Sequence, residues 1–428
     1  MNKVVCVPRA MLPNILAPDT VYFSMYSVSN SPYVGHVAAQ LRKQVEQAGL
    51  YPDINTWDFT TFALAVSAAD KAIRRVESPN GWTRLINLQL AVHDVSLWQR
   101  ITLELETMLK FLTGDFWTLE FVADNEPLPG AKTPISHNAD CVALLSGGMD
   151  SLIGAINLVN NGRKPFIVSH TVRGNTPLQD QFARQLVQSK EFCQWSGAIK
   201  LPKSRIMPGE GSTRGRSIVF FAFAALAATG LPISGNQSKE IIVSENGFIS
   251  LNISLNPSRV SSLSTKTTHP VYMDYLRHIW QALRLNLVLV TPYQFCTKGE
   301  MVRNCRNQSL LRTLLGSSVS CGKYGVHKLT HCGRCVPCMV RRAAFQVAGI
   351  QDTTRYVYSS LRGAGHGLHP NDVGAMAMQC VMSHHPDFLG KVLGEFAFAT
   401  RLDRPKFIDV YIRGLSEVEQ LLRAHSVI

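Results

Sequence analysis

The chain has 428 residues, of which 46% are hydrophobic and 17% are charged, and its formal net charge is +13. This composition is typical of a folded globular protein and excludes an intrinsically disordered chain, while the length predicts two or three domains. The positive charge favours an acidic partner, such as nucleotide phosphates, a nucleic acid or an acidic protein face.

Nothing in the sequence predicts export or a membrane partner. Residues 1–20 lack the sustained apolar segment of a secretory signal. The most apolar stretch, residues 218–233, is shorter than the roughly 20 residues that cross a bilayer, so we expect a buried helix there. Ten cysteines, four of them clustered, indicate a metal site in a reducing compartment rather than a disulfide framework. We therefore expect a cytoplasmic protein.

Residues 1–135 are predicted to form a separate α+β domain without a catalytic constellation, followed by a linker rich in proline and glycine at 126–134. The expected elements are helices over 63–76 and 97–112 and strands over 85–92 and 117–122. The first helix should carry its charges on the solvent side; these are Asp70, Lys71, Arg74 and Arg75. We expect the tryptophans to lie in the core rather than to bind a ligand; they are Trp57, Trp82, Trp98 and Trp117.

Residues 136–350 alternate between strand and helix patterns, which predicts an α/β domain with a doubly wound parallel sheet. The expected strands are 141–145, 165–170, 199–202, 240–244 and 285–291, and the expected helices are 151–160, 177–195, 217–229 and 270–283. Ligands of such sheets bind beyond the carboxyl ends of the strands. Residues 351–428 read as a C-terminal helical extension for packing or partner contact, with helices over 373–382, 389–398 and 416–424.

A turn between the first of these strands and its helix is the first candidate site. It consists of Leu145, Ser146, Gly147, Gly148, Met149, Asp150 and Ser151. Backbone N–H groups at a helix start bind anions, and glycines let a phosphate approach the main chain. Asp150 suits a role in holding Mg²⁺ or in orienting the turn. The pattern lacks the Walker lysine, and it resembles the SGGxDS signature of the PP-loop ATP pyrophosphatases, which transfer AMP from ATP to an acceptor oxygen.

Four cysteines predict a metal site. Cys332, Cys335 and Cys338 are each separated by two residues, and Cys321 supplies a more distant fourth thiolate. Four thiolates fill the tetrahedral coordination shell of Zn²⁺, so we expect a structural rather than a hydrolytic zinc. The histidines between them are alternative ligands, although four cysteines already suffice; they are His327 and His331.

Two further stretches carry cations that suit a phosphate site. Residues 209–217 combine glycines with Arg214 and Arg216 before a helix, where guanidinium groups pair with phosphate oxygens; a solvated basic loop is the alternative. Lys298 suits stabilisation of negative charge on pyrophosphate or an acyl adenylate, and an ordinary helix start is the alternative. In the histidine-containing loop 363–370, a plain connector is favoured over an active-site lid.

The order of these elements resembles the QueC family, the 7-cyano-7-deazaguanine synthases of the PP-loop superfamily. The resemblance covers about residues 139–350. It runs through the loop at 146–151, the Gly-Arg loop and apolar helix at 215–229, the Thr-Pro and Lys-x-Glu residues at 291–300, and the cysteines at 321–338. It implies a PP-loop fold of the adenine nucleotide alpha hydrolase-like type. It also implies that ATP activates a 7-deazaguanine carboxylate, with ammonia as nitrogen donor.

The resemblance assigns roles to residues of this sequence. The turn would hold ATP and its Mg²⁺, Arg216 and Lys298 would face the triphosphate or the adenylate beside Asp150, and the four cysteines would bind a structural Zn²⁺. The sequence departs from the family pattern at 169–174, where Ser-His-Thr-Val-Arg-Gly replaces an aspartate-tyrosine-glycine-glutamine segment. It departs again at Ser217, where the family has asparagine.

The N-terminal domain and the helical extension have no counterpart in the small housekeeping enzyme. Both resemble the QueC-like component of the Qat anti-phage defence system, whose other members include an ATPase and a TatD-like nuclease. We hypothesise that the additional domains dock a larger nucleophile, such as the amine of a partner protein from that system. Intact-mass analysis of co-expressed partners would count against this hypothesis if it showed no adduct of deazaguanine size.

Two alternatives to this ligase activity remain. The first is adenylation of a nucleic-acid base for sulfur or amine insertion, which the positive charge supports, although a nucleic-acid partner is not required. The second is a scaffold that binds ATP without turnover. Stimulation of pyrophosphate release by RNA would favour the first, and tight ATP binding without pyrophosphate release would favour the second.

Overall fold

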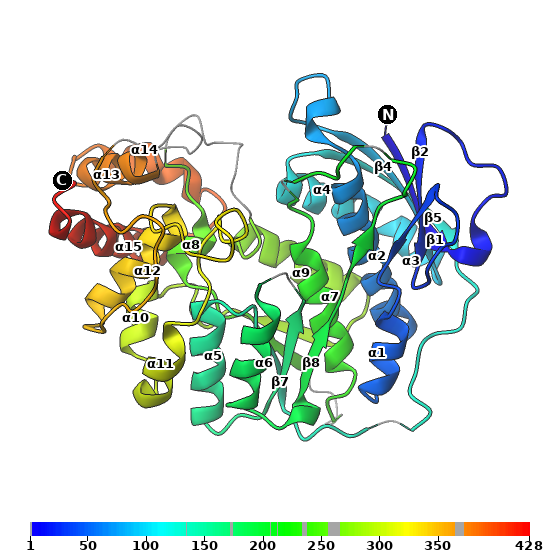
Figure 1. Ribbon diagram of the computed structural model, residues 1–428, viewed down its shortest axis with the longest axis horizontal. Coiled ribbons are helices and arrows are strands. Elements are labelled where there is room, and N and C mark those ends of the chain that lie inside the picture. The colour runs from blue at the N-terminus through cyan, green and yellow to red at the C-terminus, as the bar shows by residue number, and fades with distance from the viewer. Residues whose placement is uncertain are drawn as a thin grey trace.

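The chain folds around two β-sheets that flank a layer of buried helices (Figure 1). The computed structural model describes residues 2–133, 135–171, 174–205, 207–211, 213–232, 238–255, 266–363 and 372–428. The N-terminal sheet and the C-terminal helices lie at opposite sides of the molecule, with the second sheet between them (Figure 1).

The six-stranded sheet belongs mainly to the N-terminal part of the chain. Its strands are β1 (Asn2–Pro8), β2 (Thr20–Met25), β3 (Val34–Val37), β4 (Leu85–Val92), β5 (Phe116–Ala123) and β9 (Ile199–Lys200), in the order β5-β4-β1-β2-β3-β9. The helices of this part are α1 (Leu41–Gln47), α2 (Ile54–Ala72), α3 (Val95–Arg100) and α4 (Thr102–Thr113). All strand pairs are parallel except β3 with β9.

The expectation of an α+β domain over residues 1–135 is therefore corrected to an α/β arrangement. Helices α3 and α4 connect β4 to β5 and bring the chain back to the end of the sheet where β4 begins, so β4 and β5 run parallel. The sequence prediction found β4 and β5 but missed β1, β2 and β3. The predicted helix over 97–112 is divided, with Ile101 between α3 and α4.

The five-stranded sheet confirms a doubly wound parallel arrangement. Its strands are β6 (Cys141–Leu144), β7 (Pro165–His170), β8 (Phe192–Trp195), β10 (Lys239–Ile242) and β11 (Leu287–Val290), in the order β11-β10-β6-β7-β8 with every pair parallel. Its helices are α5 (Met149–Asn160), α6 (Thr176–Arg184), α7 (Ser217–Ala228), α8 (Gly247–Leu251) and α9 (Pro270–Ala282). The strand order reverses at β6, which places the turn after β6 at the topological switch point, where ligands of such sheets bind.

Two predictions for this region were wrong. Residues 177–195 form α6 and then β8 rather than one helix, because residues 192–195 alternate in burial and pair with β7. The strand predicted over 199–202 is β9, which pairs antiparallel with β3 in the other sheet. A segment of the central region thus completes the N-terminal sheet.

Helices α2 and α7 form the layer between the sheets. They pack against each other, α2 also against β4 and α7 against β6 and β7. Ten of the twelve residues of α7 are buried, which confirms the expected core helix. Trp57, Trp98 and Trp117 are also buried, as predicted, and Trp82 is partly exposed. Across the described segments, we find no helix with the length and apolarity that spanning a membrane requires.

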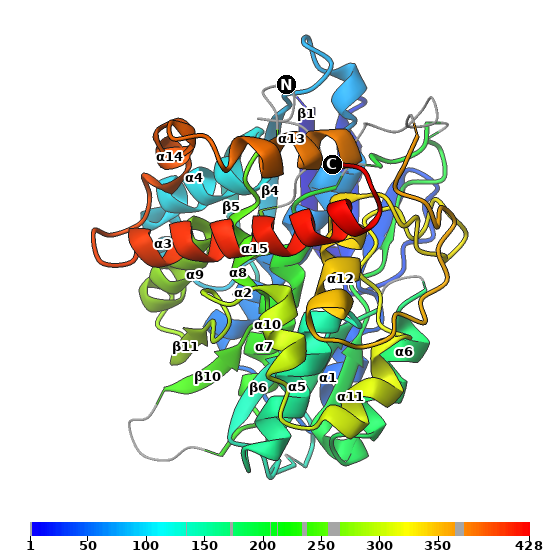
Figure 2. The same ribbon diagram turned by 90° about the vertical axis from the view of Figure 1, so that its left-hand side faces the viewer.

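The C-terminal part is helical and packs on the end of the central region. Its helices are α10 (Lys298–Arg303), α11 (Gln308–Leu315), α12 (Val336–Val347), α13 (Asp372–Met382), α14 (Phe388–Val392) and α15 (Arg404–Ala424). Helix α15, which has 21 residues and is more than twice as long as its predicted counterpart at 416–424, crosses over α8 and α12 (Figure 2). Of the predicted loop 363–370, residues 364–370 lie outside the described residues.

A buried charge network contradicts the expected solvent-facing side of α2. The side chains of Asp70, Arg75, Arg84 and Asp115 are at most 4% exposed. Arg84 donates from Nη2 to Asp70 Oδ1 at 2.5 Å and to Asp115 Oδ2 at 2.6 Å. Arg75 donates to Asp115 Oδ1 at 2.8 Å. Although burial opposes it, Arg84 holds the pKa of Asp115 below its ordinary value. Charged side chains can be buried in this way because opposite charges pair. Helix periodicity alone does not reveal such a pairing.

Replacing Arg84 with alanine should destabilise the protein by about 3–5 kcal/mol, because two buried carboxylates lose their shared cation. The midpoint of urea denaturation measures the effect. Lys3→Ala is the control, since the ion pair of Lys3 with Glu120 is half exposed and should contribute less than about 1 kcal/mol. Equal midpoints for the two variants would contradict the assigned role of the network.

Candidate active site

The turn after β6 has the geometry of an anion site. Gly147 has a φ of +87°, a conformation that favours glycine. Ser151 Oγ accepts a hydrogen bond from Ser146 N at 3.2 Å and fixes the turn. Gly148 is the N-cap of α5, and no described side chain caps this helix. The N–H groups of the first turn therefore have no acceptor within the helix and remain available to a ligand.

Asp150 is at the centre of a buried polar group. Its Oδ1 lies 2.7 Å from Lys298 Nζ, and its Oδ2 accepts from Asn246 Nδ2 at 2.6 Å and from Asn246 N at 3.1 Å. Burial acts to raise the pKa of Asp150, but the positive charge of Lys298 and hydrogen bonds from Glu245, Lys298 and Asn246 together outweigh it, so the pKa lies below its ordinary value. The structure thus brings the two predicted residues together as a carboxylate and its cation, joined by an asparagine that follows β10.

Glu245 is a member of this group whose role sequence reasoning missed. Its carboxyl hydrogen-bonds to Asp150. Burial, followed by the charge of Asp150, raises the pKa of Glu245 well above its ordinary value. The two directions place the proton of the pair on Glu245 and the negative charge on Asp150. The available signal was its position three residues after the end of β10, at the same sheet edge as the turn.

Arg216 reaches the site from the start of α7, and the N-terminal part holds its loop. Asp70 Oδ2 accepts from the backbone N–H groups of Arg214 and Gly215, both at 2.6 Å. The guanidinium of Arg214 donates to Thr113 O at 3.2 Å and stacks over Trp82. By contrast, Arg216 lines the cavity, and we find no hydrogen bond from its guanidinium to a described residue. A guanidinium without an acceptor among the described residues suits an anionic ligand.

A cavity of about 830 Å³ connects these residues. This volume is at the upper end of the range of about 300–1,000 Å³ typical of ligand sites. Its walls include predicted site residues from three segments: Ser146, Gly148, Met149, Asp150, Ser151, Arg216 and Lys298. Two predicted residues of the turn do not line it, since Leu145 is buried in the core and Gly147 faces α6. The cavity is also lined by Glu245 and, from the C-terminal helices, by Asp372 and Tyr411.

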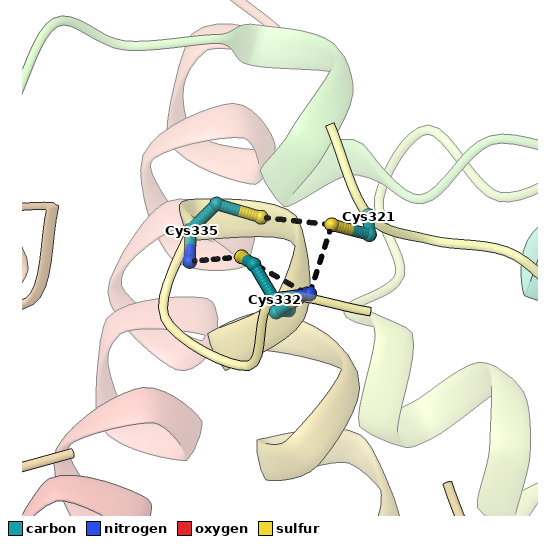
Figure 3. A group of neighbouring side chains, drawn as sticks. Cys321, Cys332 and Cys335 are labelled. Carbon is teal, nitrogen blue, oxygen red and sulfur yellow. Dashed lines mark hydrogen bonds between the residues drawn. The ribbon is translucent and has the colours of Figure 1, made fainter. Parts of the chain in front are cut away.

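The four predicted cysteines form one buried cluster, and their ligand atoms all lie within 4.8 Å of one another. The Sγ atoms of Cys321 and Cys335 are 3.9 Å apart, and those of Cys332 and Cys338 are 3.8 Å apart. A ZnS₄ tetrahedron with bonds of about 2.3 Å has edges of about 3.8 Å, so the sulfurs fit zinc. Figure 3 shows three of the side chains converging in the loop before α12. Neither intervening histidine belongs to the cluster, and His331 instead accepts from Ser320 N.

The cysteine cluster also adjoins the turn. The segment that leads into Cys321 is anchored by a hydrogen bond from Val319 N to Gly147 O at 2.9 Å. Val319, Ser320 and Cys321 line the same cavity as Asp150. A metal held by the cluster would therefore fix one wall of the cavity without taking part in chemistry there.

Fold and site define a mixed α/β protein with parallel sheets, consistent with a Rossmann-like or PP-loop fold, and with a cysteine cluster that fits zinc. Residues 268–349 match the model of the family described as Queuosine biosynthesis protein QueC. This segment contains Lys298 and the four cysteines, whereas the turn at 145–151 lies outside it. The family match is thus limited to about a fifth of the chain.

Three similar relatives are 7-cyano-7-deazaguanine synthases. That of Sinorhizobium fredii is 37% identical over 71 residues, or 17% of this chain and 28% of the relative. That of Agrobacterium fabrum is 38% identical over 71 residues, with the same shares. That of Brucella ovis is 41% identical over 68 residues, or 16% of this chain and 27% of the relative. The chain therefore matches less than a third of these relatives' length. No solved structure matches it significantly.

Proposed function

We propose that this protein uses ATP to adenylate the carboxylate of a 7-deazaguanine and then transfers the acyl group to a nitrogen nucleophile. The observation that carries the proposal is the open helix start at the switch point of the sheet, which shares one cavity with Asp150, Lys298 and Arg216. The QueC-like segment and the similar synthases support the choice of a deazaguanine.

The reaction has two balanced steps. A carboxylate oxygen of the substrate attacks the α-phosphorus of ATP, an O–P bond forms, and pyrophosphate leaves. A nitrogen nucleophile then attacks the acyl carbon, a C–N bond forms, the C–O bond to AMP breaks, and the nitrogen loses a proton. In this proposal, fixed N–H groups and cations stabilise the negative charge that develops in both steps.

Each residue has a proposed role in this chemistry. The first-turn N–H groups of α5 bind phosphate oxygens, and Lys298 and Arg216 stabilise the charge on pyrophosphate and on the adenylate. Asp150, kept ionised by Lys298, offers the oxygen ligand that Mg²⁺ prefers. Bound Mg²⁺ would add charge neutralisation at the triphosphate. The four cysteines leave zinc no open position, so its role is structural.

The proposal extends to a setting and a nucleophile. We place the protein in anti-phage defence of the Qat type, acting with partner proteins of that system on ammonia or on a partner-protein amine. Support comes from the resemblance of the N-terminal and C-terminal additions to that system's QueC-like component. The volume of the cavity leaves room for an acceptor beside a nucleotide.

Incubation with ATP, Mg²⁺ and 7-carboxy-7-deazaguanine tests the activity. AMP, pyrophosphate and a base of changed mass are the expected products, and omission of the base should abolish AMP formation. Pyrophosphate release that depends on RNA but not on the deazapurine would contradict the proposed substrate. Tight ATP binding without any pyrophosphate release would contradict the proposed reaction.

A further inference from the structure

Helix α15 contacts the turn that carries Lys298. Thr297, Lys298 and Gly299 begin α10, and Glu417 lies on α15, 120 residues later than Thr297. Thr297 Oγ1 donates a hydrogen bond to Glu417 Oε1, and Gly299 N donates to Glu417 Oε2 at 3.1 Å. Both oxygens of this buried carboxylate are therefore used to bind the residues on either side of Lys298.

A second side chain of α15 fixes the same segment. Arg413 precedes Glu417 by four residues and so lies on the same face of the helix. It forms an ion pair with Glu300 and donates to Phe295 O at 2.9 Å. The close approach requires glycine at position 299, since a Cβ there would lie 2.5 Å from Glu417 Oε1. One face of α15 thus holds the segment from Phe295 to Glu300 in place.

Lys298 connects this contact with α15 to the cavity. Its backbone is fixed on both sides by Glu417, and its Nζ lies 2.7 Å from Asp150 Oδ1. A lysine side chain is long and flexible, so the position of its backbone limits where its charge can act. Misplacement of a catalytic group by about 1 Å can lower turnover by about 10²-fold.

We propose that Glu417 is a positioning residue for Lys298, and that the C-terminal extension is in this way a functional part of the adenylating site. The inference rests on the proposed function, because Lys298 has its role only if ATP reacts in this cavity. It replaces the expectation that the extension serves packing or partner contact alone. Figure 2 shows α15 crossing in front of α8 and α12.

The test compares kcat and KM for ATP-dependent AMP formation in variants of the full chain. Glu417→Ala should lower kcat by about 10- to 100-fold. Glu417→Gln should restore most of it, because an amide can accept from Gly299 N and donate to Thr297 Oγ1. In a Lys298→Ala background, Glu417→Ala should change kcat by less than about twofold, since two residues that act through one interaction are not additive. Glu417→Asp, too short to reach both partners, replaces the alanine variant if that variant does not fold.

Glu419→Ala is the matched control. Glu419 lies on the same helix with the same 8% exposure as Glu417, and it pairs with Arg423 and His384 instead of the turn. This variant should keep the parental kcat. An equal loss in Glu419→Ala would overturn the proposal, as would multiplicative effects of Glu417→Ala and Lys298→Ala.

Failure of the proposed function gives a different result. If Lys298→Ala turned over normally, the role of Lys298 would be wrong whatever Glu417 does. If the parent protein formed no AMP, calorimetric ATP affinity would replace kcat in the same double-mutant comparison. Glu417→Ala should then weaken ATP binding only when Lys298 is present, and equal weakening in both backgrounds would overturn the positioning role.

Discussion

Asp150→Asn is expected to lower ATP-dependent pyrophosphate release by at least about 10²–10³-fold, the effect of removing a preorganised charge-stabilising group. The amide keeps the size of the side chain and an acceptor for Asn246, but it loses the charge paired with Lys298 and the oxygen ligand proposed for Mg²⁺. Pyrophosphate release measures the effect, and circular dichroism verifies that the variant is folded. Asp150→Ala is less suitable, since it would also remove the oxygen that accepts from Asn246 and leave a void in the buried group.

Asp140→Asn is the control for this prediction. Asp140 precedes β6 at the opposite end of the strand from the turn, and its half-exposed carboxylate pairs with Arg163. The control should turn over at the parental rate. Equal rates for Asp150→Asn and Asp140→Asn would refute the assignment of the ATP site.

Cys335→Ser should cause the largest change in metal content and a marked loss of stability. Zinc binding is coupled to folding, and a serine hydroxyl is a far weaker zinc ligand than a thiolate. Because the segment leading into Cys321, another ligand of the same cluster, is bonded to Gly147 through Val319, pyrophosphate release should also decline. Elemental analysis and thermal denaturation measure the first two effects.

Cys305→Ser separates the effect of zinc from that of a lost thiol. Cys305 is buried but lies outside the four-cysteine cluster, so its replacement should leave the zinc content unchanged. A zinc-free Cys335→Ser variant with the melting temperature of Cys305→Ser would contradict the structural role of the metal.

The second sheet was predictable because each of its strands and helices has a recognisable pattern within a short stretch of sequence. Apolar strands such as β7 alternate with helices such as α7, and the spacing alone indicates a parallel sheet. The N-terminal sheet was not predictable in the same way. Strand β3 has four residues and β9 only two, too few for a period, and Ile199 of β9 pairs with Val37 of β3 from 162 residues further along the chain.

The same distinction applies to the site. The turn at 145–151 and the cysteine spacing are local motifs, so their residues could be named from the sequence. The roles of Asp70 and Glu417 depend on contacts with residues 144 and 120 positions away. A charged residue on a helix is usually exposed, so sequence patterns placed Asp70 in solvent. Only the fold shows that Asp70 binds the loop that carries Arg216 and that Glu417 binds the turn that carries Lys298.

The most direct test of the central claim is the position of the nucleotide in a crystal structure with Mg²⁺ and a non-hydrolysable ATP analogue. We predict phosphate oxygens within hydrogen-bond distance of the first-turn N–H groups of α5, with Lys298 and Arg216 on the triphosphate. A nucleotide bound elsewhere, with the turn after β6 empty, would contradict the account.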